Sequence, residues 1–578
     1  MKRVGRTAVH DLRGYVGEGG ELDADNPKLA RTFRRLGDVI RGGGVVAFPT
    51  ETVYGLGVDA FNDAALETLY GMKGRPRDNP LIVHIGGRGD VGLVASHVPE
   101  DAERLMDAFW PGPLTIILMK ADALPPAATA GLPTVAVRQP SHGAAAALIK
   151  ACGRPIAAPS ANLSGKPSAV TAESVLEDFG GSVDAVIDCG DSPIGLESTV
   201  IDMSGPTYRI CRYGAVTPEA IRALLPGMGR SETEAEGPPI SPGMRHRHYA
   251  PEARVQAIYG DRPSCLAAAL DMAAGMCGAG RKVGFLCGGE HAGLLPRMVT
   301  KGMGAVRPTA WGEGYRLYES LREFDREGYD DIVTIIPGGA GGPGPGLAGL
   351  CGVSLALADR VARASDGRVT DVSGRAAAAR LPGWVRGRLG PSGRRAPPNL
   401  PGAPVPPGPS APSILFVCSG NTCRSPMAEA IFKDLLTSSF PVLSRAVGSV
   451  GSAGTSAAPG QKVAEYAERA MLDLYGADVG SKRSESLASG MAEDAAVILA
   501  MDRGHLRRLE AMGRGGVSML LGASMAGGEG GEGRGLDGEV RDPYGGDLSE
   551  YYECALRIHK FALFFLLSLE NAIEGGLE

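Results

Sequence analysis

Apolar residues along this chain occur in short runs that are separated by polar, helix-forming segments. Between residues 33 and 222 the apolar runs predict strands, whereas apolar positions three or four residues apart predict helices at 63–74 and 101–110. The predicted strands lie at 43–48, 81–85, 114–119, 134–138, 155–160 and 184–190. Strands that alternate with helices in this way are typical of an α/β domain.

The same alternation returns twice further along the chain. Apolar runs at 255–260, 282–288 and 331–337 predict strands of a second α/β domain, and residues 310–328 predict an amphipathic helix. A third α/β domain begins at Ser413 and ends with a helix before Glu578. The chain is therefore expected to contain several α/β domains in series.

Two stretches between these domains cannot form a core. Residues 228–252 are polar and proline-rich, and residues 391–412 contain nine prolines, which is typical of an extended linker. The predicted organisation is an extension (1–32), a first domain (33–222), a linker or lid (223–255), a second domain (256–372), a linker (373–412) and a third domain (413–578).

Composition adds limits on class and compartment. The 85 glycines and 42 prolines among 578 residues approach a disordered composition, but 44 % apolar residues suffice for packed cores, and a net charge of −6 argues against a general polyanion binder. The ten cysteines include no C-x-x-C pair, the first 30 residues contain no apolar run, and the stretch 561–567 is too short for a membrane span. A cytoplasmic, reduced protein without a membrane partner is expected.

The sharpest chemistry lies at the start of the third domain. In "ILFVCSGNTCRS", Cys418 follows a strand and Arg424 opens a helix, so that the loop amides can surround an oxyanion at the helix N-terminus. The helix dipole and Arg424 would favour a Cys418 thiolate nucleophile, and Ser425 could stabilise it as a leaving group. Asp542 in "RDPYGG" could be the general acid. A buried structural cysteine in a helix-capping loop is the simpler alternative.

This domain resembles the low-molecular-weight protein phosphatases over residues 413–572, through "VCSGNTCRSPMAEA", "SAGTSA" (452–457) and "DPYGG". The resemblance implies a doubly wound fold, a cysteinyl-phosphate intermediate on a phosphorylated protein substrate, and no metal or other cofactor. It implies Cys418, Arg424 and Asp542 as catalytic residues. The remaining phosphate-loop residues would be Ser419, Gly420, Asn421, Thr422, Cys423 and Ser425.

The residue before the second loop cysteine bears on the substrate. Phosphotyrosine enzymes of this family usually carry an aliphatic residue there, whereas this chain has Thr422, as in members that resemble protein-arginine phosphatases. Phosphoarginine is therefore the expected substrate, and phosphotyrosine is the alternative. Arsenate reductases share the fold but need further redox cysteines, and none lies between Cys423 and Cys554.

The first domain brings basic residues and small, hydroxyl-rich loops together, as triphosphate binding requires. The segments are "FPTETVYGLG" (48–57), "KGRPRDNPLIVHI" (73–85), "APSANLSGKPS" (158–168) and "ESTV" (197–200), and no P-loop sequence is present. In this order they resemble the threonylcarbamoyl-adenylate synthases, the YrdC/Sua5 family, with a twisted-sheet fold over residues 33–222. "SPGMRHRHYAP" (241–251) resembles the linker of the two-domain form, and residues 256–367 resemble its Rossmann-like C-terminal domain through "GVSLALADRVARAS" (352–365).

The implied reaction joins L-threonine, bicarbonate and ATP into threonylcarbamoyl-AMP and releases pyrophosphate, with Mg²⁺ accompanying ATP and no dedicated metal site. The product serves the modification of adenosine 37 in tRNA, an indirect partner. The resemblance implies threonine contacts from Thr50, His84, Arg138, Ala158 and Ser198. It implies ATP contacts from Lys73, Arg75, Asn79, Thr134, Ser160, Asn162, Ser168, Arg212 and Tyr249.

Three alternatives stay open at this point. The linker cations Arg245, His246, Arg247 and His248 form either a lid over the phosphates or a solvated basic segment. The first domain could instead be an RNA-binding module, against which the acidic charge and the lack of aromatic stacking motifs count. The phosphatase half could be an inert scaffold, but the presence of Cys418, Arg424 and Asp542 argues against this alternative.

Overall fold

The computed structural model describes most of the chain. The described residues are 2–4, 7–17, 21–23, 26–226, 249–260, 262–288, 291, 293–296, 300–302, 305–309, 312–336, 352–372, 413–525 and 538–574. The predictions for the linker cations at 245–248 and for the linker 373–412 concern residues outside these ranges. None of the helices in the described ranges is long and apolar enough to cross a membrane.

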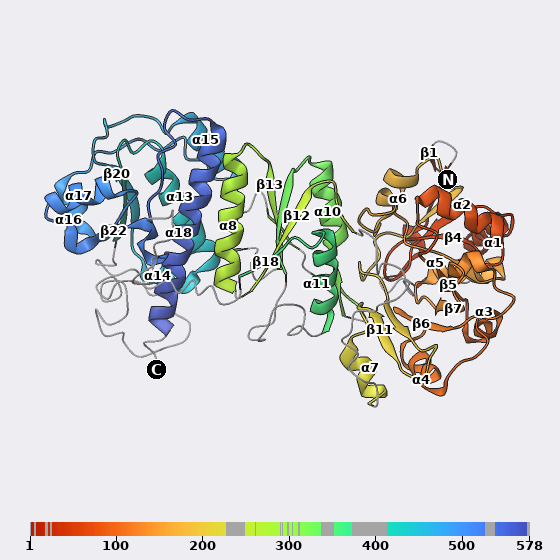
Figure 1. Ribbon diagram of the computed structural model, residues 1–578. Coiled ribbons are helices and arrows are strands. Elements are labelled where there is room, and N and C mark those ends of the chain that lie inside the picture. Colours follow the sequence, from red (N-terminus) through yellow and green to blue (C-terminus); the bar gives the residue numbers. More distant parts are fainter. Residues whose placement is uncertain are drawn as a thin grey trace. The chain divides into compact units, whose positions relative to one another are not determined.

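The chain divides into two compact units, each built from several stretches of sequence. The first unit contains residues 1–257, 303–328 and 336–369, and the second contains 258–302, 329–335 and 370–578. The residues expected to form the second α/β domain are therefore shared between the two units. Figure 1 labels the elements of both.

The first unit is built around an eleven-stranded sheet in the order β1-β2-β9-β3-β4-β8-β5-β7-β6-β10-β11. Its strands are β1 (Lys2–Val4), β2 (Thr7–Asp11), β3 (Val46–Phe48), β4 (Gly55–Asp59), β5 (Ile82–His84), β6 (Leu114–Met119), β7 (Thr134–Arg138), β8 (Ile156–Ala157), β9 (Ala185–Asp188), β10 (Thr199–Asp202) and β11 (Arg209–Arg212). Strand β2 lies parallel to β9, so residues of the N-terminal extension enlarge this sheet.

Helices cover both faces of this sheet. They are α1 (Pro27–Arg41), α2 (Asp63–Lys73), α3 (Val91–Val94), α4 (Glu100–Phe109), α5 (Gly143–Cys152), α6 (Ala172–Phe179) and α7 (Pro218–Leu224). Successive strand residues point to opposite faces, and accordingly Val46 and Phe48 pack in one core with α1 and α5, whereas Val45 and Ala47 pack in the other. The expected α/β class is confirmed, and the sheet contains both parallel and antiparallel strand pairs.

Local sequence signals fix several helix ends. Asn62 caps α2 by accepting a hydrogen bond from the amide of Ala65, and Gly74 ends the helix in the left-handed conformation (φ 61°). Thr217 caps α7, which has Pro218 as its first residue. These caps explain why the predicted helix at 63–74 agrees with the structure to within one residue.

Four further elements of the first unit come from later in the sequence. They are β15 (Ala305–Thr309), β16 (Gly312–Tyr315), α10 (Leu317–Arg326) and α11 (Gly352–Ala364). The prediction of one helix over 310–328 is wrong in its first part, because residues 312–315 pair with β15 in an antiparallel hairpin. That pairing supplies backbone hydrogen bonds that the helical pattern alone could not reveal.

The second unit contains two sheets. A five-stranded sheet has the order β14-β13-β17-β12-β18. Its strands are β12 (Arg254–Tyr259), β13 (Val283–Cys287), β14 (Thr300–Gly302), β17 (Asp331–Ile335) and β18 (Val369–Asp371), and helix α8 (Arg262–Gly278) packs on β13 and β17. Strands β12 and β18 begin among residues of the first unit.

The other sheet has the order β20-β19-β21-β22, and its strands are parallel. The strands are β19 (Ser413–Cys418), β20 (Val450–Gly454), β21 (Ala495–Ala500) and β22 (Ser518–Leu520). The helices are α13 (Arg424–Ser439), α14 (Pro441–Ala446), α15 (Glu465–Tyr475), α16 (Ser489–Asp494), α17 (Arg503–Ala511) and α18 (Leu548–Glu574).

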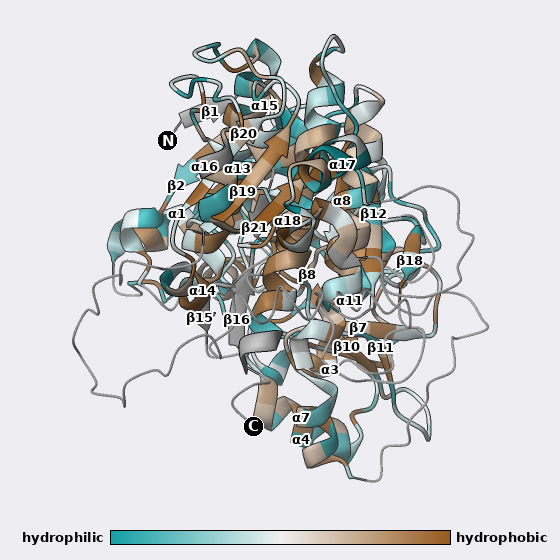
Figure 2. Ribbon diagram, turned by 90° about the vertical axis from the view of Figure 1, so that its left-hand side faces the viewer, coloured by the Kyte–Doolittle hydropathy of each residue, from teal (hydrophilic) through white to brown (hydrophobic). Residues whose placement is uncertain are grey.

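Apolar residues of β19 divide between two cores, as in a doubly wound fold. Phe416 packs with α13, α15 and α18, whereas Leu415 and Val417 pack with α16 and α17. Figure 2 shows hydrophobic residues concentrated on β19 and β21. Parallel strands with helices on both faces bring the C-terminal ends of the strands to one edge, where ligand sites of such folds form.

Helix α18 also packs along α8 within the second unit. The Lys560 ammonium, whose side chain is 4 % exposed, donates to both carboxylate oxygens of Asp271 at 2.7 and 2.6 Å. His559 Nε2 lies 2.9 Å from the carbonyl oxygen of Leu294. Apolar residues of α8 and α18 belong to one continuous core. The third predicted domain therefore shares its core with part of the second.

Candidate active sites

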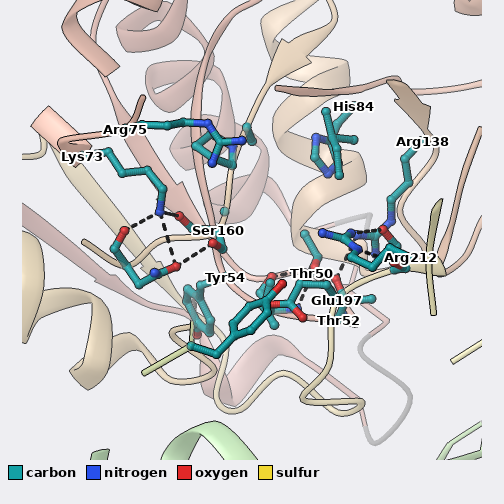
Figure 3. A pocket seen from close by; sticks show the side chains of 18 of the residues that line it. Thr50, Thr52, Tyr54, Lys73, Arg75, His84, Arg138, Ser160, Glu197 and Arg212 are labelled. Atoms are coloured by element: carbon teal, nitrogen blue, oxygen red, sulfur yellow. Dashed lines mark hydrogen bonds between the residues drawn. The ribbon is translucent and has the colours of Figure 1, made fainter. Parts of the chain in front are cut away.

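A pocket opens in the first unit, where several loops meet the ends of the sheet strands. Figure 3 shows Lys73 and Arg75 on one side of this pocket and Arg138 and Arg212 on the other. Eleven of the fourteen residues that the sequence assigned to threonine and ATP line it. They are Thr50, Lys73, Arg75, His84, Arg138, Ala158, Ser160, Asn162, Ser198, Arg212 and Tyr249.

The other three predicted residues do not line the pocket. The side chain of Asn79 accepts from Arg75 Nη2 at 2.7 Å, and Ser168 donates to Glu197 at 2.6 Å, so both contact lining residues. Thr134 begins β7, four residues before Arg138. Because a strand rises about 3.3 Å per residue, Thr134 lies roughly 13 Å from the pocket end of its strand.

Lys73 is held at the pocket by the loop that carries Ser160. Its ammonium donates to the carbonyl oxygen of Ser160 at 2.6 Å and to that of Asn162. Burial, together with the charge of Arg75, lowers the pKa of Lys73 well below its ordinary value. Lys73, Ser160 and Asn162 are therefore one hydrogen-bonded cluster. An entering anion would relieve the unfavourable burial of Lys73 and Arg75.

His84 and Arg138 lie opposite each other on the parallel strands β5 and β7. Burial, and then the charge of Arg138, lowers the pKa of His84 to about 3, so the imidazole is neutral near pH 7. Its Nδ1 is buried and has no hydrogen-bond partner among the described residues. This atom is available to a ligand in the pocket.

Arg138 is fixed by an acidic and a hydroxyl partner. Its Nη2 lies 2.6 Å from a carboxylate oxygen of the buried Glu51, and its Nη1 donates to the hydroxyl of Thr52 at 2.9 Å. Glu51 and Thr52 lie in the segment "FPTETVYGLG" and were not predicted as site residues, although a buried arginine requires such partners. Arg212 is fixed similarly, donating to the carbonyl and hydroxyl oxygens of Ser198 at 3.0 Å each.

Glu197 is a further pocket residue that the sequence interpretation missed. Burial alone would raise its pKa, but the charges of Arg360 and Arg212 outweigh that effect and lower the pKa to about 2. The sequence feature from which Glu197 could have been predicted was its position in the "ESTV" segment. No group of three or more metal-ligating side chains occurs in the part of the chain that the structure describes, and the pocket carboxylate of Glu197 is paired with Arg360.

The second site lies at the C-terminal end of β19, in the second unit. Cys418 ends the strand and Arg424 begins α13, as predicted. The Cys418 sulfur lies 3.0 Å from the hydroxyl oxygen of Ser425 and accepts from the amide of Asn421 at 3.3 Å. The Ser425 hydroxyl and the Asn421 amide can both donate to the sulfur, so the structure brings the predicted nucleophile and Ser425 together.

Asn421 holds the loop in shape. It adopts φ 53°, and its side-chain amide donates to the hydroxyls of Ser425 and Ser452 at 2.9 Å each. At Gly454 an added Cβ would lie 2.5 Å from the carbonyl oxygen of Ser419, so the loop needs glycine at this position. The stretch "SAGTSA", through which the domain resembles the phosphatase family, thus supports the loop from β20.

The guanidinium of Arg424 contacts two carboxylates. Its Nη1 donates to Asp502 at 2.9 Å and its Nη2 donates to Asp542 at 2.5 Å, so the predicted acid lies beside the predicted phosphate-binding residue. Asp502 was not predicted. It caps α17 by accepting from the amide of His505, and the His505 ring Nε2 lies 2.8 Å from the Ser419 hydroxyl.

Models of known protein families match three parts of the chain. Residues 38–214 match the "Telomere recombination" (Sua5, YciO, YrdC) family model, residues 216–366 match the threonylcarbamoyl-AMP synthase C-terminal domain, and residues 413–573 match the low-molecular-weight phosphotyrosine protein phosphatase model. The threonylcarbamoyl-AMP synthase of Bacillus subtilis is 40 % identical over 364 residues, which are 62 % of this chain and 98 % of that protein. The chain belongs to the threonylcarbamoyl-AMP synthase family.

Two proteins of Pyrococcus abyssi origin extend this assignment of the synthase part. The threonylcarbamoyl-AMP synthase of that organism is 41 % identical over 299 residues, covering 51 % of this chain and 86 % of the relative. The crystal structure of P. abyssi Sua5 complexed with L-threonine has a TM-score of 0.55 and 36 % identity, covering 63 % of this chain and 100 % of that one. In this chain the synthase is fused to a low-molecular-weight phosphatase domain.

Proposed function

We propose that the first site joins L-threonine, bicarbonate and ATP into threonylcarbamoyl-AMP and pyrophosphate. The observation that carries this proposal is the pocket lined by eleven of the fourteen residues that the family resemblance implied for threonine and ATP. The relative solved with L-threonine supports threonine as one substrate. The product would serve tRNA modification, which makes tRNA an indirect partner and is the reason for proposing a cytoplasmic location.

The pocket suits a reaction that proceeds by positioning. The threonine amine and bicarbonate condense to a carbamate with loss of water, and a carbamate oxygen then attacks the α-phosphorus of ATP, with pyrophosphate as the leaving group. Lys73 and Arg75 would neutralise phosphate charge, and the neutral His84 can accept a hydrogen bond from the substrate. Mg²⁺ would enter bound to the phosphates of ATP, because the described pocket residues offer no carboxylate cage.

The test of this proposal is pyrophosphate release by the full-length protein. Release is expected only when ATP, L-threonine and bicarbonate are all present, and Arg138→Met should abolish it because its cation is buried in the pocket. Tight tRNA binding without any threonine-dependent release would favour the RNA-binding alternative and overturn the proposal.

We propose that the second site hydrolyses phosphorylated protein through a cysteinyl-phosphate. Cys418 attacks phosphorus, Arg424 binds the equatorial oxygens, and Asp542 protonates the departing group. The contacts of Cys418 with Ser425 and Asn421, and of Arg424 with Asp542, support these roles. Loss of p-nitrophenyl phosphate hydrolysis in Cys418→Ser is expected, and retained activity would contradict the nucleophile.

Phosphoarginine is the proposed substrate, with phosphotyrosine as the alternative. The Thr422 side chain is half-buried in the phosphate loop, and a Cβ added at Gly420 would lie 3.3 Å from its hydroxyl oxygen, so the hydroxyl belongs to the loop rather than to bulk solvent. A hydroxyl there can hydrogen-bond a guanidinium, whereas an alkyl group could only pack on an aromatic ring.

Substrate choice is tested by turnover of phosphoarginine and phosphotyrosine peptides. Thr422→Ile should lower kcat/KM for phosphoarginine by about tenfold and raise the relative rate on phosphotyrosine. Thr437→Ile, an exposed substitution on α13, is the matched control. A preference of the wild-type protein for phosphotyrosine would overturn the assignment.

A further inference from the structure

The pocket carboxylate of Glu197 is held by residues from a distant part of the sequence. The hydroxyl of Tyr318 on α10 donates to Glu197 Oε2 at 2.6 Å, and Arg360 Nε on α11 donates to the same oxygen at 3.0 Å. Ser168, from the first domain, donates to the other carboxylate oxygen. All these residues belong to the first unit and are buried, and their hydrogen bonds join them into one network.

Tyr249 packs against the same two side chains. Its ring lies on that of Tyr318 with centroids 5.2 Å apart and an angle of 26°, and the Arg360 guanidinium carbon lies 5.3 Å from its centroid. Tyr249 lines the pocket and adopts φ 65°, a conformation that a non-glycine residue keeps only when its surroundings hold it. α10 and α11 therefore supply the surface on which this pocket residue rests.

Arg360 is fully buried, so its charge requires compensation. It forms ion pairs with Glu197 and Asp359, and its Nη2 donates to the carbonyl oxygen of Tyr213 at 2.7 Å. Without Arg360, Arg212 would be the main cation still acting on the buried Glu197 carboxylate. It would then compete with the phosphates of ATP for Arg212 and place an uncompensated negative charge in the nucleotide pocket.

We propose that Arg360 and Tyr318 are positioning residues of the nucleotide pocket, through which the C-terminal synthase domain completes the ATP site. They neutralise Glu197 and hold Tyr249 at the pocket. The inference rests on the proposed synthase function, because it assigns ATP to this pocket. In this proposal the C-terminal domain contributes to the binding of the nucleotide and not to the binding of threonine.

The test measures binding of a non-hydrolysable ATP analogue and, separately, of L-threonine to full-length variants. Arg360→Met is expected to weaken analogue binding by about tenfold or more, and Tyr318→Phe by a smaller factor, because buried hydrogen bonds to a charged group are lost. Threonine affinity should change by less than about twofold. Arg326→Met on α10, a half-exposed arginine outside the pocket, is the matched control.

A double variant separates this role from a general effect on folding. Glu197→Gln combined with Arg360→Met removes both charges, so analogue affinity should recover partly relative to Arg360→Met alone. Equal affinity of wild type, Arg360→Met and Tyr318→Phe for the analogue would overturn the inference, as would equal loss of ATP and threonine binding. A wild-type protein that binds no analogue at all would instead contradict the proposed synthase function.

Discussion

Asp542 Oδ2 lies 2.5 Å from Arg424 Nη2, so the proposed general acid and the phosphate-binding arginine are paired with each other in the ligand-free phosphatase site. A phosphoryl group that binds Arg424 must compete with this carboxylate. Asp542 therefore has two opposing effects in the proposed mechanism. It donates a proton during turnover, but its pairing with Arg424 opposes the binding of the phosphoryl anion.

Replacing Asp542 by alanine should separate these two effects. The kcat for p-nitrophenyl phosphate is expected to fall by about 100-fold or more, whereas the inhibition constant of inorganic phosphate should decrease because Arg424 loses a competing partner. Asp547→Ala changes an exposed acid of the same loop that does not contact Arg424, and should alter neither constant. Unchanged or weaker phosphate inhibition in Asp542→Ala would contradict the competition.

The close approach of β20 to the phosphate loop predicts a sharp effect of a single methyl group. A Cβ at position 454 would meet the backbone of Ser419 and Asn421 at 2.5 and 2.9 Å, so Gly454→Ala must displace the loop. A displacement of this kind is expected to lower phosphatase kcat by about tenfold to 100-fold. Gly451→Ala on the same strand meets nothing closer than 3.9 Å and should be nearly silent. Equal kinetics of the two variants would refute the steric argument.

The buried His84 predicts a pH-dependent contribution to stability. Its pKa in the folded protein is about 3, against an ordinary value of 6.5, so below pH 6.5 the unfolded chain binds a proton that the folded one does not. Stability from this residue is complete above pH 6.5 and is lost as the pH falls toward 3. Between pH 7 and 4.5 the loss should be about 2.5 kcal/mol.

The measurement compares the free energy of urea unfolding of the wild type and His84→Gln at pH 7 and pH 4.5, followed through the fluorescence of Trp110. The difference between the two proteins should shift in favour of the variant by about 2.5 kcal/mol at the lower pH. His97→Gln, which changes an exposed histidine, should not show this shift. A pH-independent difference for His84→Gln would mean that the imidazole titrates normally.

The α8–α18 contact predicts that the phosphatase stays attached after the linker is cut. With a specific protease site introduced within residues 391–412 of the full chain, the two cleaved fragments should co-elute in size-exclusion chromatography. Lys560→Asp leaves Asp271 facing a like charge in a partly buried contact and should weaken the association by about 100-fold, or about 3 kcal/mol.

Charge exchange provides the control for that experiment. Asp271→Lys together with Lys560→Asp restores opposite charges across the two helices, so co-elution should return. Fragments of the wild-type protein that separate at micromolar concentration would show that the linker alone joins them.

Much of this molecule could be predicted from its sequence because its signals are local. Strands β6 and β7 match the predicted ranges, since each is an apolar run between clear turn residues. The strand and the helix that hold Cys418 and Arg424 could be predicted because both residues lie within one short strand–loop–helix segment.

The unpredicted features depend on contacts between residues far apart in sequence. Arg360 and Glu197 are 163 residues apart, and no periodicity or motif connects them. The hairpin at 312–315 replaced part of a predicted helix because its partner strand, and not its own pattern, determines its conformation. Thr134 was assigned to ATP through resemblance alone, and its position at the far end of β7 was accessible only from the fold.

Helix α8 has apolar residues around most of its circumference: one side faces β13 and β17, and the other faces α18. A chain that ended before residue 413 would leave the second side in water. The truncated protein would expose an apolar surface that promotes self-association. To produce the synthase alone, the side of α8 that faces α18 would therefore have to be redesigned with polar residues. The same change would be required in any natural lineage that lost the phosphatase gene segment.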